Sequence, residues 1–202
     1  MSERKVYDLF PDPVFQYKLE NYKEINKDLL NYILELKKKD EIGNSRSNRG
    51  GWHSPNFDLV SKGPPINFIN SFKNFLKEII INEIGWEYVP NKQRIVAMWA
   101  IINKKNSYNV RHNHQNCYLS AAYYIKKPKN SGEISFYDPK EVRTYRFPEI
   151  KNYTNYSAEV KTIKPEEGDL LIFPSYLYHS VGENLSEDDR IIISFNVDIE
   201  YE

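Results

Sequence analysis

The sequence predicts a mainly β fold with helices on its N-terminal side, and two periodic patterns support this prediction. In the first ninety residues, apolar side chains recur every three or four positions, which is the spacing of an amphipathic helix. From residue 94 onward, short β-branched and aromatic runs are separated by turn-forming sequences. Helices followed by many short strands are typical of a β-sandwich or barrel that helices buttress.

Two helices are expected in the N-terminal part. The first covers residues 22–38, where apolar positions such as Leu29 and Ile33 alternate with Lys and Glu. The second covers residues 65–83, and Phe72 belongs to its apolar face.

Six strands are expected after the helices, at residues 94–103, 118–126, 133–137, 158–163, 169–173 and 190–199. Turn sequences such as Asn130-Ser131-Gly132 lie between them. No internal repeat or low-complexity linker divides the chain. We therefore expect one domain over residues 1–202, with a helical buttress at about 1–90 and a β core at about 94–202.

The composition bears on partners and compartment. The chain has 28 basic and 28 acidic residues, so it has no net field to attract nucleic acid or an anionic membrane. A small-molecule or peptide substrate is therefore expected, while the oligomeric state is left open. Cys117 is the one cysteine, which excludes an intramolecular disulfide and fits a reducing compartment. Because no apolar run reaches the length of about 18 residues that a membrane helix needs, we expect a soluble, cytoplasmic protein.

Three of the four histidines predict a metal site. His112 and His114 are two residues apart, and such residues on a strand share one face at a spacing of about 6 to 7 Å. His179 follows a buried apolar run and a proline, and a sandwich or barrel can bring it beside the other two. Imidazole is the commonest protein ligand for divalent metals. We interpret the three residues as an iron site.

Three further motifs accompany these histidines. The sequence Tyr123-Tyr124-Ile125 lies in a strand that follows His112-x-His114. Gly168-Asp169 opens the hydrophobic run that leads to His179. About ten residues past His179, Arg190 opens the last predicted strand.

The order and spacing of these motifs resemble the 2-oxoglutarate/Fe(II)-dependent oxygenases, in particular the prolyl-hydroxylase-like branch and a group of oxygenases from bacteria and phages. The resemblance covers about residues 95–198. It implies a double-stranded β-helix, which is a jelly roll of the cupin type. It also implies an Fe(II)- and 2-oxoglutarate-dependent dioxygenase that uses O₂, releases succinate and hydroxylates an unidentified substrate.

The resemblance assigns roles to individual residues. His112, His114 and His179 would hold the iron, which leaves positions open for 2-oxoglutarate and O₂. Arg190 would bind the far carboxylate of 2-oxoglutarate, because its planar guanidinium matches a carboxylate. The alternative for Arg190 is a solvated charge or a partner of a neighbouring aspartate.

Strand alternation extends the predicted co-substrate site. With Arg190 facing inward, Ser194 faces inward too and can share the carboxylate. Tyr118 and Tyr124 lie on one face of their strand, so both are candidate co-substrate contacts, and Tyr123 is expected to pack outside. The alternative for Tyr124 is aromatic packing in the core.

His114 departs from the family pattern. It occupies the position where the family has the carboxylate of a two-histidine, one-carboxylate triad. Three imidazoles make the site more positive by one charge, which favours anionic 2-oxoglutarate. In two alternatives, an Asp or Glu from elsewhere supplies the third ligand, or His114 contacts substrate.

Other interpretations of the three histidines stay open. A cupin-like metal-binding protein or a non-redox enzyme could use them for zinc or nickel. A structural β-sandwich could carry them without any metal. Trp52 and His53 lie in a glycine-rich loop that could cover the cavity, although a large aromatic side chain more often anchors such a loop by packing.

Overall fold

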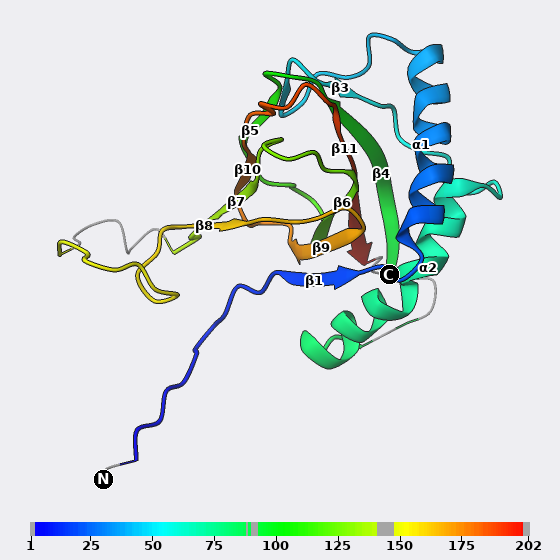
Figure 1. The fold of residues 1–202 in the computed structure, drawn as a ribbon. Helices are drawn as coiled ribbons and strands as arrows, with labels where there is room; N and C mark the ends of the chain where they lie inside the picture. The colour runs from blue at the N-terminus through cyan, green and yellow to red at the C-terminus, as the bar shows by residue number, and fades with distance from the viewer. Residues whose placement is uncertain (1–2, 88, 90–92, 141–147, 200–202) are drawn as a thin grey trace.

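The computed structural model describes residues 3–87, 89, 93–140 and 148–199, which form two antiparallel sheets and two helices (Figure 1). In spatial order, the larger sheet contains β1 (Phe15–Lys18), β9 (Asp169–Pro174), β6 (Leu119–Lys126), β11 (Arg190–Ile199), β4 (Gln93–Asn103) and β3 (Trp52–His53). The smaller sheet contains β2 (Asn48–Arg49), β5 (Tyr108–His112), β10 (His179–Val181), β7 (Ile134–Tyr137) and β8 (Val160–Ile163). The predicted mainly β fold with N-terminal helices is confirmed.

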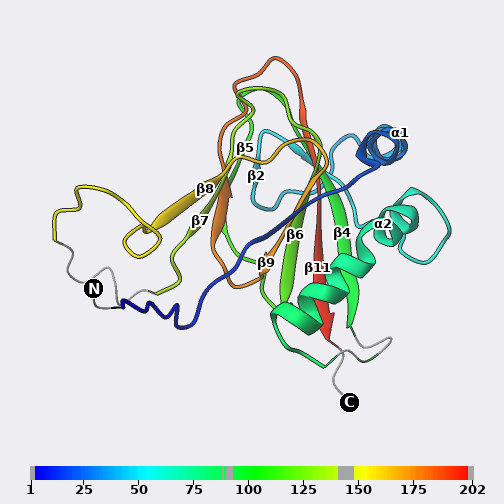
Figure 2. The same ribbon diagram turned by 60° about the horizontal axis from the view of Figure 1, so that its bottom comes forward.

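The helices lie on the outer side of the larger sheet (Figures 1 and 2). They are α1 (Tyr22–Lys39) and α2 (Pro64–Glu78), and a π-helical turn, η1 (Ile79–Glu83), continues α2. Two prolines stand at the first positions of α2, where their missing N–H groups cost nothing. Three lysines occupy the last turn of α1, where they oppose the negative end of the helix dipole. Both predicted helices are confirmed to within a few residues.

The two faces of the larger sheet contact different parts of the molecule. On β11, Ile193 and Phe195 face the helices, and the ring of Phe195 stacks on Phe72 of α2 at 4.9 Å between centroids. Ile192 and Ser194, one step away in the alternation, face the smaller sheet and line a cavity. The outer face therefore provides the hydrophobic core with the helices, and the inner face provides polar groups.

Tyr123 of β6 joins the sheet to both helices. Its hydroxyl donates a hydrogen bond of 2.6 Å to Asn26 of α1, whose amide in turn donates to the carbonyl of Ile125. Its ring also packs on Phe68 of α2 at 4.6 Å between centroids. The expectation that Tyr123 packs outside the barrel is confirmed.

The division at residue 90 is less sharp than predicted. The N-terminal part contributes β1 to one edge of the larger sheet and β3 to the other, while β2 lies at an edge of the smaller sheet. These strands have two to four residues, which is too short to show a periodic pattern. Within the described ranges, no helix has the length and apolar character that crossing a membrane requires.

Candidate metal and co-substrate site

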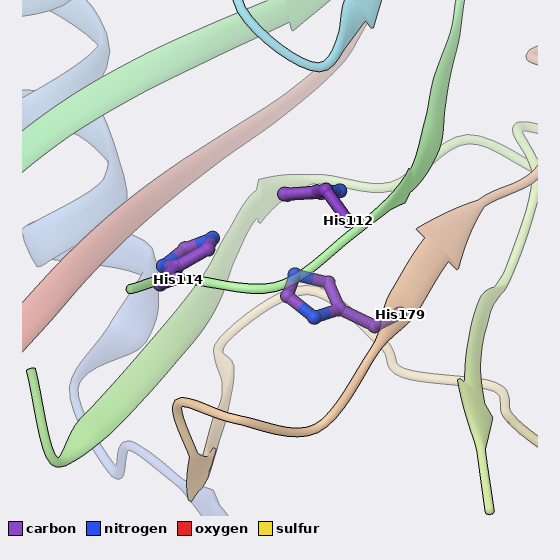
Figure 3. Close-up of side chains that lie close together, drawn as sticks. All are labelled: His112, His114 and His179. Atoms are coloured by element: carbon purple, nitrogen blue, oxygen red, sulfur yellow. The ribbon is translucent and has the colours of Figure 1, made fainter. Parts of the chain in front are cut away.

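The register of the smaller sheet brings His112 and His179 together. β5 and β10 are antiparallel neighbours, and His179 lies directly opposite His112 in their pairing. The two ring centroids are 4.3 Å apart. Two histidines that are far apart in the sequence thus face each other across neighbouring strands (Figure 3).

His114 joins them from the segment that follows β5. Its ring centroid lies 5.3 Å from that of His112 and 5.2 Å from that of His179. Its backbone N–H donates to the carbonyl of Ser175 at 3.0 Å, which fixes the chain after the strand. The cluster is therefore built between the two sheets (Figure 3).

Hydrogen bonds leave the same nitrogen free in all three rings. Nδ1 of His112 lies 2.8 Å from the carbonyl oxygen of Val110, and Nδ1 of His179 lies 3.0 Å from that of Leu177. A carbonyl can only accept, so both Nδ1 atoms carry the proton and both Nε2 atoms carry a lone pair. Nδ1 of His114 lies 2.6 Å from the amide oxygen of Asn196, which has the same consequence.

The three side chains form a candidate metal site. One ligand nitrogen from each lies within 4.8 Å of the others, and the described residues contain no other such group of three. Oriented imidazoles whose second nitrogen donates to a carbonyl or amide oxygen are typical of metal ligands. The donor set therefore fits a divalent transition metal such as iron.

Burial keeps these imidazoles neutral at pH 7. Loss of hydration lowers the pKa of His114 to about 4 and that of His179 to about 3. The pKa of His112 is lowered for the same reason. Neutral imidazole is the form that binds a metal, so no proton has to leave first.

The histidines border a cavity of about 730 Å³. Tyr124, Ser194 and Asn196 line it, as strand alternation predicts. Among the described residues that line it, none is Asp or Glu. The described residues therefore give no support to the alternative in which an acidic residue from elsewhere completes the metal site.

Arg190 is a buried cation that forms no salt bridge with any described residue, although the negative charge of Glu133 is near enough to oppose the lowering of its pKa by burial. Only 1% of its surface is exposed, so the alternative of a solvated surface charge is wrong. Its Nη1 donates to the carbonyls of Ser131 and Gly182. Its Nε and Nη2 have no hydrogen-bond partner in the described part of the chain, and the same holds for the nearby hydroxyl of Tyr124.

The environment of Arg190 suits an incoming anion. Burial lowers the pKa of Arg190 to about 10, which still leaves the guanidinium charged at pH 7. Burial raises the pKa of Tyr124, so its hydroxyl stays protonated and can donate a hydrogen bond. Burial of a charge whose N–H groups are only partly hydrogen-bonded is costly, and a carboxylate that binds Nε and Nη2 would reduce that cost. Arg190 is not itself among the residues that line the cavity, but Tyr124, whose hydroxyl also lacks a partner among the described residues, is. The histidines suit a metal ion, and the guanidinium and the Tyr124 hydroxyl suit the carboxylate of a co-substrate.

Tyr118 lies apart from the other predicted contacts. It is not among the residues that line the cavity, and its ring packs edge-on against Trp86 at 5.3 Å between centroids. It precedes β6, which begins at Leu119, so the alternation of the strand does not extend to it. The geometry does not support the prediction that Tyr118 contacts the co-substrate.

His53 was not predicted as a site residue, but it lines the same cavity. Its ring stacks on Trp99 at 5.6 Å between centroids, and Trp99 lies 5.6 Å from the ring of His114. Trp52, its neighbour in the sequence, is buried and donates a hydrogen bond to the carbonyl of Asp40, so it anchors the segment. All four histidines of the chain thus border one cavity.

Comparison with known families identifies the domain. Residues 97–196 match the family described as "Putative 2OG-Fe(II) oxygenase". These residues include the three clustered histidines, Tyr124 and Arg190. No curated protein matches the chain.

Solved structures show the same fold at low sequence identity. A prolyl-4-hydroxylase of Pseudomonas putida is 12% identical, with 96% of each chain covered and a TM-score of 0.68. A prolyl hydroxylase of Trichoplax adhaerens, in complex with a hypoxia inducible factor peptide, is 15% identical, with 92% of this chain and 83% of that chain covered and a TM-score of 0.64.

A third structure comes from a different substrate class. HygX of Streptomyces hygroscopicus, with nickel, 2-oxoglutarate and hygromycin B bound, is 12% identical, with 94% of this chain and 84% of that chain covered and a TM-score of 0.62. The fold is therefore the double-stranded β-helix of these oxygenases. The family match and the fold together make the chain a member of the 2-oxoglutarate/Fe(II)-dependent oxygenases, which are non-haem iron enzymes with Fe(II) and 2-oxoglutarate as cofactor and co-substrate.

Proposed function

We propose that the protein hydroxylates a small-molecule or peptide substrate, with His112, His114 and His179 as iron ligands and Arg190 as the anchor of 2-oxoglutarate. The observation that carries this proposal is the pairing of two features in one domain. Three neutral imidazoles converge at the cavity, and a guanidinium with two nitrogen atoms that lack a partner among the described residues is buried in the same barrel. The first would hold a divalent metal, and the second calls for an anion.

Arg190, Tyr124 and Ser194 are the residues proposed to bind the co-substrate. Arg190 would bind the far carboxylate through Nε and Nη2, the two nitrogen atoms that lack a partner among the described residues. Tyr124 would donate its free hydroxyl to the same carboxylate, and Ser194 lines the cavity close by in the sheet. Both lie on strands paired with each other, with Ile192 opposite Tyr124 and Ser194 opposite Ala122.

The residues around the cavity prepare the reaction. When bound, Fe(II) and 2-oxoglutarate supply oxidation of a substrate C–H bond by O₂, with CO₂ and succinate as co-products. The apolar side chains of Ile134, Val181 and Ile192 border the inner part of the cavity and exclude water there. His114 is held by Asn196 and by Ser120, whose Oγ lies 2.9 Å from its Nδ1. These contacts would fix the ligand before the metal arrives.

Solved structures with this fold support both parts of the proposed substrate class, peptides and small molecules. Related structures are in complex with a peptide in one case and with hygromycin B in another. Cys117 has no disulfide partner within the chain, which supports a reducing, cytoplasmic compartment.

Anaerobic binding of 2-oxoglutarate to Fe(II)-loaded protein tests the proposal. Wild type should bind it and, in the presence of O₂, convert it to succinate. Arg190→Met keeps an unbranched stem as far as the position of Nε but removes the charged end of the guanidinium, so it should weaken 2-oxoglutarate binding by about a hundredfold, the equivalent of a lost charge-assisted pair. Lys126→Met, which changes a partly exposed lysine of β6 paired with Asp188, is the control and should leave the affinity unchanged. Equal affinity in wild type and Arg190→Met contradicts the assignment of Arg190.

A further inference from the structure

The cavity has a wall that the iron and 2-oxoglutarate site leaves unused. Segment 44–56 and Trp99 of β4 form this wall, which we name the outer wall. It presents the guanidinium of Arg46, the imidazole of His53 and the indole of Trp99. None of these residues has a role in holding the metal or the co-substrate in the function proposed above.

The backbone around Arg46 is fixed by Asn48, which is 7% exposed. The side-chain oxygen of Asn48 accepts from the N–H of Arg46 at 2.8 Å, and its amide donates to the carbonyl of Gly51 at 2.7 Å. The carbonyl of Ser47 accepts from the N–H of Val110, which ties the segment to β5. Arg46 therefore projects from an ordered turn, although its side chain is exposed.

Arg46 sets the charge of the outer wall. Among the described residues that line the cavity, Arg46 is the one permanently charged side chain, since the others are neutral amides, hydroxyls, imidazoles and apolar groups. Three neutral imidazoles leave both charges of a divalent metal uncompensated. The two charges of 2-oxoglutarate would balance the metal, so Arg46 leaves the lining of the loaded cavity with one excess positive charge.

His53 and Trp99 give the outer wall a flat aromatic part. The rings of His53 and Trp99 are stacked at an interplanar angle of 10°. Nδ1 of His53 donates to the carbonyl of Ser54 at 2.7 Å, so its Nε2 carries a lone pair. The wall thus combines a cation, a planar surface and a hydrogen-bond acceptor.

We propose that the outer wall recognises the prime substrate, and that this substrate carries a carboxylate or phosphate group that Arg46 binds, with a planar or apolar body against Trp99 and His53. This inference rests on the proposed function and names the substrate class of the same site. A positively charged substrate is disfavoured, because the described lining offers it no carboxylate and the loaded site repels it.

Titration calorimetry on zinc-loaded protein with saturating 2-oxoglutarate tests this inference, because zinc occupies the metal site without turnover. The probes share one aromatic body and differ in charge: phenylacetate, phenyl phosphate, phenylacetamide and phenethylamine. At least one anion should bind about tenfold more tightly than the amide, and the amine should bind most weakly. The better of the two anions distinguishes a carboxylate from a phosphate substrate.

Two variants make the result specific to Arg46. Arg46→Gln should reduce the ratio of anion affinity to amide affinity to about twofold or less. Added salt should weaken binding of the anion to wild type but not to the variant. Lys62→Gln, which removes an equal charge from an exposed position outside the cavity, should behave as wild type. Equal binding of anion and amide, absence of binding by every probe, or an anion preference that survives in Arg46→Gln overturns the inference.

The same titrations separate this inference from the proposed function. Affinity for 2-oxoglutarate is measured first on wild type and on Arg46→Gln. Intact co-substrate binding without an anion preference contradicts the substrate class alone. Absence of co-substrate binding contradicts the proposed function, and the anion preference of the wall is then measured in the Arg190→Met variant, where the inner guanidinium cannot bind the probe.

Discussion

Among single residues, His114 changes the chemistry of the site most. The family places a carboxylate at this position, and an imidazole there raises the charge of the site by one. The contacts of His114 match those of a ligand, because Asn196 fixes its tautomer and Nε2 is left with the lone pair. In the described part of the chain, no acidic side chain reaches the cavity to replace it.

We therefore expect His114 to bind the metal. His114→Ala should weaken zinc or Fe(II) binding by at least about tenfold, since it removes one of three ligands. His114→Asp should retain the metal, because it restores the carboxylate of the family pattern, but it should bind 2-oxoglutarate less tightly than wild type because the site loses one positive charge. Competition with a chelating dye measures the first effect and calorimetry the second. Unchanged metal affinity in His114→Ala contradicts the assignment.

Asn196 is expected to act through His114. Asn196→Ala removes the 2.6 Å hydrogen bond to Nδ1 and should weaken metal binding by about tenfold, which is typical of the groups that orient metal ligands. Asn196→Asp supplies a stronger acceptor in the same place and should restore the affinity. Asn113→Ala, at another amide that lines the cavity, is the matched control. A purely structural role would make the Ala and Asp variants equally poor in the dye competition.

His53 and Tyr118 show what the sequence cannot reveal about single residues. Sequence spacing was sufficient to predict His112, His114 and Arg190 as site residues, because each belongs to a strand or to a motif at a strand end. His53 lies far from them in the sequence, on a two-residue strand, and reaches the cavity through the pairing of β3 with β4. The predicted position of Tyr118 differs from the observed one because the chain turns before β6. Its ring packs against Trp86 instead.

At the scale of secondary-structure elements, the turn before β7 holds the guanidinium of Arg190, the proposed anchor of the co-substrate. Gly132 has φ of +83°, a conformation that favours glycine. A Cβ at this position would lie 2.6 Å from Nη1 of Arg190 and would also meet the backbone of Gly182. The turn therefore packs directly against the guanidinium and determines where it lies.

Gly132→Ala should consequently damage both stability and co-substrate binding. Gly85→Ala is its matched control, because Gly85 has a similar φ of +79° but its Cβ would meet nothing within 4 Å. The control should lose about 1 to 2 kcal/mol of unfolding free energy from backbone strain alone. Gly132→Ala should lose more than the control and should also weaken 2-oxoglutarate binding, which urea unfolding and calorimetry measure. Similar losses in both variants, with normal 2-oxoglutarate binding, contradict the proposed contact.

The long strands were predictable, and the short ones were not. β4, β6 and β11 each carry at least eight residues with a clear apolar character, and their predicted bounds agree with the structure to within one residue. β2 and β3 lie in a glycine-rich sequence, and only tertiary pairing makes them strands. The prediction of the site has the same limit. The alternation of side chains predicts which face of a strand a residue lies on, but it does not predict which strands pair with each other.

Across the whole molecule, one sheet serves two purposes. Its outer face packs on the helices through side chains such as Phe195 and Tyr123. Its inner face carries Ser194 and Tyr124, which line the cavity, and Ser120, which contacts Nδ1 of His114. The side chains that form the hydrophobic core and the side chains that border the site thus lie on the same strands but on opposite faces of the sheet. Because burial is extensive on both faces, the imidazoles between the two sheets lose their hydration, and this loss couples the site to the stability of the fold.

This coupling predicts a pH dependence of the metal-free protein. The pKa values of His114 and His179 fall from 6.5 to about 4 and about 3 on folding, so the unfolded chain binds more protons below pH 6.5. Stability should be unaffected by these groups above pH 6.5 and should decrease as the pH falls from 6.5 toward 4, by up to about 1.4 kcal/mol per pH unit for each imidazole. Urea unfolding with a chelator present, at several pH values between 4.5 and 7, measures this slope. The double variant His114→Asn, His179→Asn retains the carboxylates of the chain, so it should show a shallower slope than wild type. Parallel slopes would mean that the buried imidazoles do not contribute to acid sensitivity.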